Sequence, residues 1–188
     1  YGVRGFVAFE INAMTCEILS DKKLISEGCG GQCAEGPHIY KKDGMYYLMI
    51  AEGGTEYAHR ETIQRAENVW GPYTPCPHNP IISHKEYKKS EIQATGHADL
   101  IEDANGNWWL VFLGIRRFSH ALLHNLGRET FLAPVKWEDG WPVVGYNGNG
   151  TKELVMDAPL PGLDYEESKA NIHTDDKTGK PMLYADHS

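Results

Sequence analysis

The chain has 188 residues, of which 41% are hydrophobic and 23% charged, and its formal net charge is −8. This acidic balance argues against a nucleic-acid partner, because binding to a phosphate backbone depends on clustered Lys and Arg. No apolar run is long enough for a membrane helix, so we expect no membrane partner either. Ten Tyr and five Trp are compatible with a sugar ligand, although strands also favour aromatic residues.

Two short strands are expected at the beginning of the chain, over residues 3–11 and 17–25, with a polar turn between them. We interpret them as the outer strands of a blade whose inner strands precede Tyr1. Because the sequence begins with Tyr rather than Met, we expect the chain to be a fragment or a processed product. A Gly-rich loop over residues 27–33 follows and leads to Glu35.

A first full set of strands is expected from Glu35 to about Lys41, from residue 45 to 51, and from residue 59 to 65. Asp-Gly at positions 43 and 44 forms the first turn. The prolines of residues 71–80 predict turns rather than a strand.

A second set begins near Thr95, turns at Asn105-Gly106 and returns over residues 107–114. Its third strand is expected over residues 128–137 and its fourth over residues 141–144. Since no amphipathic helix of more than two turns is apparent, the predicted fold class is all-β.

The domain boundary is expected near residue 145. Residues 1–145 would form a partial propeller catalytic domain, and residues 146–188 a linker and the start of a further blade or C-terminal region. A further hairpin around Thr178-Gly179 is only weakly indicated. The four cysteines are expected as free thiols rather than as a disulfide framework or a zinc site.

The two strand sets repeat each other at an offset of 62 residues. Gly44 corresponds to Gly106, and Glu35 corresponds to His97. Two apolar strands around an Asp-Gly or Asn-Gly turn, repeated at this spacing, are typical of propeller blades. Equivalent positions at the start of each blade converge near the propeller axis, so we expect Glu35 and His97 to share one pocket.

Glu35 is the candidate general acid. It precedes Gly-Pro, where the backbone is extended and the side chain can stand away from the strand end. Burial in an aromatic-lined channel would raise the pKa of its carboxyl, as an acid working near neutral pH requires. The alternative is a solvated surface Glu at a strand start.

His97 could orient that acid, contact substrate, or hold a water or an ion, and a structural histidine is the alternative. Asp99 shares its strand face and could support His97 or anchor a turn. Arg128 could present its guanidinium to a carboxylate or to sugar hydroxyls, unless it pairs locally with Glu129.

Four segments carry a resemblance to a known family. Residues 34–44, 46–55, 95–100 and 127–135 resemble glycoside hydrolase family 43, which contains β-xylosidases and α-L-arabinofuranosidases. The resemblance implies a five-bladed β-propeller, of which this chain covers the end of the second blade, the third and fourth blades and a following linker. It also implies hydrolysis of glycosidic bonds with inversion.

The resemblance assigns roles to three residues. Glu35 would be the general acid, His97 an axial histidine that contacts a calcium or sodium ion through water, and Arg128 a contact of the terminal sugar. No cofactor is required. The aspartates that act as general base and tune the acid would lie upstream of Tyr1, so we expect an oligosaccharide substrate for the whole protein but an inactive 188-residue chain.

Two other functions fit less of the sequence. A non-catalytic carbohydrate-binding propeller would keep the fold and lack the upstream aspartates. A propeller hydrolase of the invertase type, acting on fructosides, would have the same architecture but a retaining nucleophile and different motifs.

Overall fold

In the computed structural model, residues 5–118, 123–144, 172–174 and 181–183 are described. They contain strands, turns and loops and no helix, so no described helix could cross a lipid bilayer. The strands are β1 (Phe6–Ala8), β2 (Lys23–Ser26), β3 (Glu35–Lys42), β4 (Met45–Glu52), β5 (Arg60–Ala66), β6 (Thr74–Pro75), β7 (Ile92–Glu102), β8 (Trp108–Arg116), β9 (Arg128–Glu138), β10 (Trp141–Val144), β11 (Ile172–Thr174) and β12 (Pro181–Leu183).

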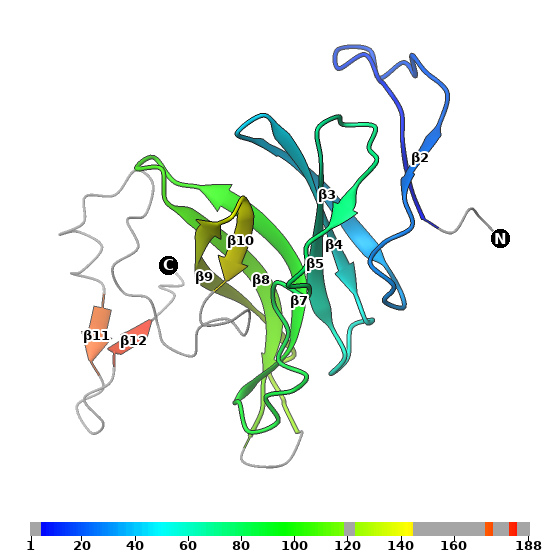
Figure 1. Ribbon diagram of the computed structural model, residues 1–188. Helices are drawn as coiled ribbons and strands as arrows, with labels where there is room; N and C mark the ends of the chain where they lie inside the picture. The colour runs from blue at the N-terminus through cyan, green and yellow to red at the C-terminus, as the bar shows by residue number, and fades with distance from the viewer. Residues whose placement is uncertain (1–4, 119–122, 145–171, 175–180, 184–188) are drawn as a thin grey trace.

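Two four-stranded antiparallel sheets form the body of the molecule. One has the strand order β3-β4-β5-β6 and the other β7-β8-β9-β10, so each sheet is a meander of neighbouring strands. Figure 1 shows the two sheets side by side, with β7 against β3, β4 and β5. This arrangement confirms the predicted all-β class and the two predicted blades.

The fourth strand of the first blade, β6, corrects the sequence analysis. The prolines of residues 71–80 predict turns alone, yet Thr74 and Pro75 pair with Arg65 and Gln64 of β5. Proline is tolerated here because β6 is the edge strand of its sheet, where a missing N–H removes no interior ladder bond.

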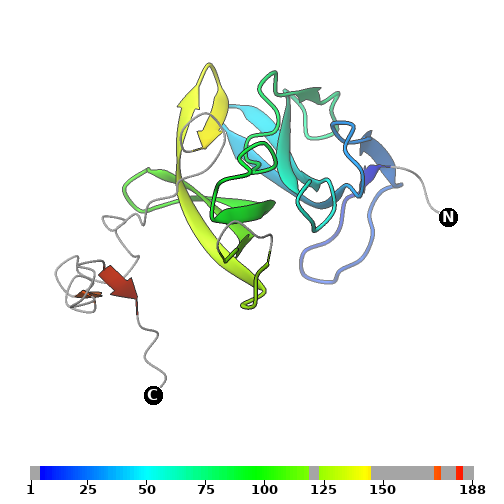
Figure 2. The ribbon, with the colours of Figure 1, turned by 90° about the horizontal axis from the view of Figure 1, so that it is seen from below.

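The N-terminal ribbon, β1 and β2, is shorter than predicted. Its strands pair antiparallel over Phe6–Ala8 and Lys23–Ser26, and beyond them a single bridge joins Ile11 and Ile18. Figure 2 shows the ribbon beside the sheet that contains β3. Its apolar side chains are largely open to solvent, with Ile11 53% and Ile18 56% exposed.

The C-terminal region was predicted to hold a linker and the start of a further blade. Most of it lies outside the described residues, as does the turn predicted at Thr178-Gly179. The strands on either side of that turn are described, and β11 pairs antiparallel with β12.

The hydrophobic core lies between the two sheets. Strand β4 is apolar on both faces, and its residues 47–51 are each at most 2% exposed. Tyr47 and Met49 pack toward Leu110 and Phe112 of β8. Burying each such side chain contributes about 1.5–3 kcal/mol, so the contact between the sheets is the main source of stability.

Polar contacts join the same two sheets at one end. The Tyr47 hydroxyl donates to the Gly140 carbonyl oxygen at 2.8 Å, and Nη1 of Arg65 donates to the same oxygen at 3.0 Å. The Arg65 guanidinium also lies over the ring of Trp141, 4.2 Å from its centroid. These contacts fix the β9–β10 turn against the first blade.

Candidate functional site

The structure brings Glu35 and His97 together. Glu35 opens β3, His97 lies within β7, and His97 Nδ1 is 3.6 Å from Glu35 Oε1. The predicted proximity of the two side chains is therefore confirmed. The distance is long for a hydrogen bond, and it suits an ion pair when the imidazole is protonated.

The surroundings of Glu35 differ from the closed aromatic channel that the sequence suggested. The Glu35 side chain is 48% exposed and that of His97 is 41% exposed. The pair therefore faces solvent within the described residues.

Gly36 leaves the space that the imidazole occupies. Strand β3 has a bulge here, because Glu35 pairs with Ala51 while His38 pairs with Met49. Gly36 has a φ of 57°, and a Cβ added to it would lie 2.9 Å from His97 Nε2. A side chain at this position would be strained and would displace the His97 ring.

Strand β7 is bulged twice at the site. Gln93, Gly96 and Asp99 pair with Ile115, Leu113 and Val111 of β8, so two residues of β7 are extra. Next to these irregularities, Ala94 has a φ of 53° and His97 a φ of 50°. Left-handed backbone costs a non-glycine residue about 1–3 kcal/mol, and it persists only where the surroundings hold it.

His59 is a buried neighbour of His97 that the sequence does not indicate as a site residue. It is 1% exposed, and its Nδ1 is 3.1 Å from the Ala94 carbonyl oxygen, which assigns the ring proton to Nδ1. The rings of His59 and His97 are 6.5 Å apart. Burial lowers the pKa of His59, and the neighbouring His97 lowers it further.

Glu61 of β5 is the second site residue that the sequence did not reveal. Its side chain is fully buried, and Oε2 accepts the backbone N–H of Ala98 at 3.0 Å. Burial raises the pKa of this carboxyl well above its ordinary value, while the backbone N–H groups of Ala98 and His97 oppose that shift. No local pattern distinguishes Glu61 from a solvent-facing residue, since five of the seven residues of β5 are polar or charged.

Glu52 holds the loop that leads to Glu35. This carboxylate is 1% exposed, and its Oε1 accepts the N–H of Cys29 at 2.7 Å. Its Oε2 is 3.3 Å from Nη2 of Arg60. Backbone pairing between the Gly53 N–H and the Gln32 carbonyl at 2.7 Å closes the same loop onto the end of β4.

Asp99 supports neither His97 nor a turn, contrary to both interpretations of it. Its Oδ1 lies 3.1 Å from His38 Nδ1 and accepts the Tyr40 hydroxyl at 3.3 Å. The Tyr40 oxygen in turn accepts the Leu100 N–H at 3.0 Å, and burial raises the pKa of Tyr40 to about 12. Asp99 therefore helps to join β3 and β7.

Arg128 is exposed at the start of β9. The alternative of a local pair with Glu129 is not what the structure shows, because Glu129 Oε2 lies 3.4 Å from Nε of Arg116. Within residues 5–118 and 123–144, Arg128 forms no ion pair, and its charge is close enough to lower the pKa of His59. Its guanidinium is thus exposed and close enough to His59 for its charge to act there.

The described residues do not supply a direct metal site near His97. Among them there is no group of three or more His, Cys, Asp or Glu side chains that could hold an ion together. Calcium prefers six to eight oxygen ligands, and the Nδ1 of His97 already faces Glu35.

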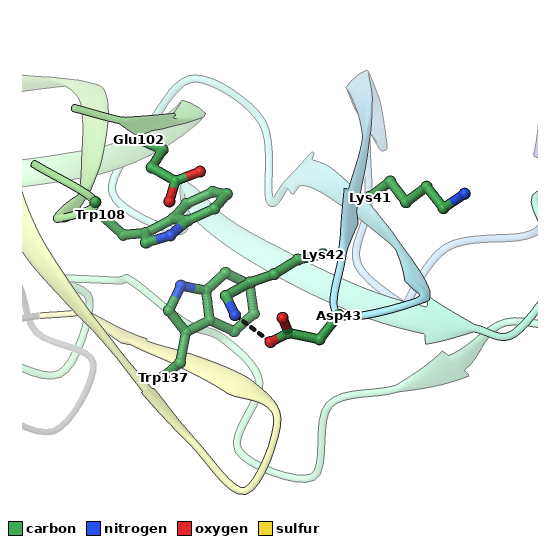
Figure 3. A pocket seen from close by; sticks show the side chains of 7 residues that line it. Lys41, Lys42, Asp43, Glu102, Trp108 and Trp137 are labelled. Carbon is green, nitrogen blue, oxygen red and sulfur yellow. Dashed lines mark hydrogen bonds and ion pairs between the residues drawn. The ribbon is translucent and has the colours of Figure 1, made fainter. Parts of the chain in front are cut away.

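A separate hollow of about 460 Å³ lies at the other ends of the same strands (Figure 3). It is lined by Lys41, Lys42, Asp43, Glu102, Gly106, Trp108 and Trp137. The rings of Trp108 and Trp137 pack edge to face at 5.3 Å, and the ammonium group of Lys42 lies 5.0 Å from the centre of the Trp137 ring. Because Trp137 also packs on Tyr47, these rings belong to the scaffold.

Comparison with known proteins identifies a family and relatives that this chain resembles. The sequence profile of glycosyl hydrolases family 43 matches residues 2–142. The chain is 54% identical over 157 residues to the non-reducing end α-L-arabinofuranosidase BoGH43B of Bacteroides ovatus, covering 83% of this chain and 29% of that protein. It is 47% identical over 145 residues to a xylosidase/arabinosidase of Butyrivibrio fibrisolvens, covering 76% of this chain and 27% of that protein.

Solved structures agree. The Bacteroides ovatus GH43B structure superposes with a TM-score of 0.77 at 43% identity, over 85% of this chain and 31% of that one. A xylan β-1,4-xylosidase from Bacillus halodurans superposes with a TM-score of 0.73 at 34% identity, over 84% and 34% of the two chains. The present chain thus spans about a third of the length of the proteins that it matches.

Proposed function

The chain belongs to glycosyl hydrolases family 43, and from that membership we propose that the protein containing it cleaves terminal xylose or arabinofuranose from plant hemicellulose oligosaccharides. The relatives named above, an arabinofuranosidase and a xylosidase/arabinosidase, support this substrate class. The proposal concerns the longer protein, because this chain spans only part of its relatives' length.

The proposed chemistry is an inverting single displacement. Glu35 donates its proton to the glycosidic oxygen as the bond to the anomeric carbon breaks, and a water on the opposite face of the sugar attacks that carbon. An aspartate outside this chain removes a proton from the water. In inverting enzymes the two carboxyl groups lie about 6.5–9.5 Å apart, which leaves room for the water.

The observation that carries this proposal is the Glu35–His97 pair. A carboxyl at the first residue of a strand, 3.6 Å from an imidazole of the next blade, is held at a fixed place while half of its surface stays open to a substrate. His97 and Arg128 are proposed to contact the hydroxyl groups of the terminal sugar. Guanidinium and imidazole groups are suited to that role as hydrogen-bond donors.

The chain alone is proposed to be inactive, because it lacks the base. No cofactor is proposed as a requirement. A calcium or sodium ion near the propeller axis would contact His97 through water, since the described residues offer no direct set of ligands.

The proposed function is tested in a chimera in which residues 2–142 replace the matching segment of the Bacteroides ovatus relative. The parent chimera should release nitrophenol from nitrophenyl β-xyloside or α-L-arabinofuranoside. Glu35→Gln should lower kcat by about 10²–10⁴-fold, the usual contribution of a general acid. Glu102→Gln, an exposed carboxylate at the opposite end of the blade, is the matched control and should leave kcat unchanged.

Two results would overturn the proposal. One is a Glu35→Gln chimera as active as its parent. The other is a folded parent chimera that binds xylo- or arabino-oligosaccharides without turnover, which would favour the non-catalytic carbohydrate-binding propeller.

A further inference from the structure

The backbone of β7 at His97 is unusual and needs an explanation. Eleven residues of β7 face nine residues of β8, and the two extra residues are taken up where Ala94 and His97 adopt left-handed conformations. Bulges of this kind re-aim side chains and are frequent next to active sites. The ladder with β8 is interrupted at this point, so it cannot by itself hold His97 in place.

Two buried side chains of the first blade contact this irregular segment. His59 Nδ1–H donates to the carbonyl oxygen of Ala94, and Oε2 of Glu61 accepts the N–H of Ala98. His59 directly precedes β5, and Glu61 is the second residue of that strand. They contact β7 on either side of residues 95–97, and they are 1% and 0% exposed.

We propose that Glu61 is a positioning residue for His97, whose buried carboxyl holds the Ala98 N–H and so fixes the left-handed bend that directs the imidazole toward Glu35. His59 secures the other end of the same bend through Ala94. The geometric inference concerns the Glu35–His97 pair itself. Only its importance for catalysis rests on the proposed function.

The physical reason is the backbone N–H of Ala98. Ala98 is 1% exposed and belongs to the stretch where the ladder with β8 is interrupted, so Glu61 supplies its acceptor. A buried donor without an acceptor is costly. Without the carboxyl, the peptide would turn to find another acceptor or water, and the adjacent His97 would turn with it.

Arg65 provides the matched control. It lies four residues after Glu61 on the same face of β5, and it also contacts the second blade, at the Asp139 and Gly140 carbonyl oxygens. If Glu61 merely joins the blades, its substitution should affect His97 no more than substitution of Arg65 does. If Glu61 positions His97, only the substitution of Glu61 should affect the imidazole.

The experiment measures the coupling between Glu35 and His97 by NMR on the 188-residue chain. The readout is the shift of the His97 imidazole ¹H–¹³C signal, assigned with His97→Gln, that Glu35→Gln produces. We expect a clear shift in the parent. Glu61→Met should abolish it, Glu61→Gln should restore most of it because an amide oxygen still accepts the Ala98 N–H, and Arg65→Met should retain it.

Other outcomes would overturn the proposal. They are a parent chain without the shift, a folded Glu61→Met chain that keeps it, and an Arg65→Met chain that loses it as fully as Glu61→Met. If Glu61→Met does not fold, Glu61→Asp replaces it. That carboxyl is shorter by one methylene, so both the His97 shift and the slow hydrogen exchange of the Ala98 amide should be lost, and their retention would contradict the proposal.

Failure of this inference is distinguishable from failure of the proposed function. An active chimera whose turnover depends on Glu35 but not on Glu61 would support the proposed function and contradict the positioning role of Glu61. A chimera without turnover, in which the Glu35–His97 coupling still depends on Glu61, would support the positioning role and contradict the proposed function.

Discussion

The two ends of the paired blades differ in how their backbones are held. At the end that carries Glu35 and His97, both β3 and β7 are bulged, and buried Glu61 and His59 contact the distorted segment. At the end that carries Trp137, the strand pairing is regular and aromatic rings pack on one another. Left-handed non-glycine residues at this end, Asp43 and Asp139, lie in hairpin turns. The comparison indicates that left-handed residues inside a strand belong to the site, while regular pairing and aromatic packing stabilise the far end.

Removing the aromatic packing should have the largest effect on stability. Trp137→Ala deletes a ring that packs on Tyr47 and Trp108, and we expect the free energy of unfolding to fall by about 3 kcal/mol. Urea denaturation followed by circular dichroism measures this loss. The coupling between Glu35 and His97 should persist in the folded variant, and its disappearance would show that the two ends are not independent.

Gly36→Ala should displace the His97 side chain and lower stability moderately. The new Cβ would lie 2.9 Å from His97 Nε2, and alanine in the left-handed region costs about 1–2 kcal/mol. We expect a loss of stability of that size together with a displaced His97 signal in the NMR spectrum. Gly44→Ala is the control, because it has a φ of 81° but nothing within 4 Å of the added Cβ. An unmoved His97 signal in Gly36→Ala would contradict the close approach.

Ala94→Gly tests whether the bend in β7 stores strain. Glycine relieves the left-handed cost of about 1–2 kcal/mol but adds about 0.4–1 kcal/mol of chain entropy to the unfolded state. Both Ala94 and Ala98 have buried methyl groups, whose removal costs about 0.8 kcal/mol, but only Ala94 is left-handed. We therefore expect Ala94→Gly to change the free energy of unfolding little and Ala98→Gly to lower it clearly, both measured by urea titration. A loss in Ala94→Gly as large as that in Ala98→Gly would show that the bend is unstrained.

The smallest effect is expected from acid at the hairpin end. Hydrogen bonds from the Trp109 indole, and then from Asn107 and Asn105, lower the pKa of Asp103 to about 2 from an ordinary 3.8. Because the folded-state pKa is the lower one, the stabilisation is complete above about pH 4 and is lost as the pH falls through about 2. The unfolding midpoint should therefore decline less between pH 4 and 2 in Asp103→Asn than in the parent.

The sequence predicted the features that depend on local chemistry. Asp-Gly and Asn-Gly turns marked both central hairpins, and the 62-residue repeat placed Glu35 beside His97 before any coordinates were known. The fourth strand β10 was predicted with its observed bounds, since Trp141–Val144 directly follows a Gly turn.

Features that arise only when strands pair were missed. The bulges of β7 can be recognised only when its register with β8 is known. Glu61 becomes important only because the folded chain brings the Ala98 N–H to its carboxyl. The sequence also does not indicate the observed partners of Asp99 and Glu129. Side chains on neighbouring strands, His38 and Arg116, compete successfully with partners that are close in sequence.

The cysteines lie at different depths, and this difference makes one of them a chemical handle. Cys33 is exposed two residues before Glu35, whereas Cys76 is buried and burial raises the pKa of Cys29. With Cys16, the other exposed thiol, replaced by Ser, a maleimide dye at neutral pH should attach to Cys33. The emission of that dye would then report whether the proposed oligosaccharide ligand binds next to Glu35.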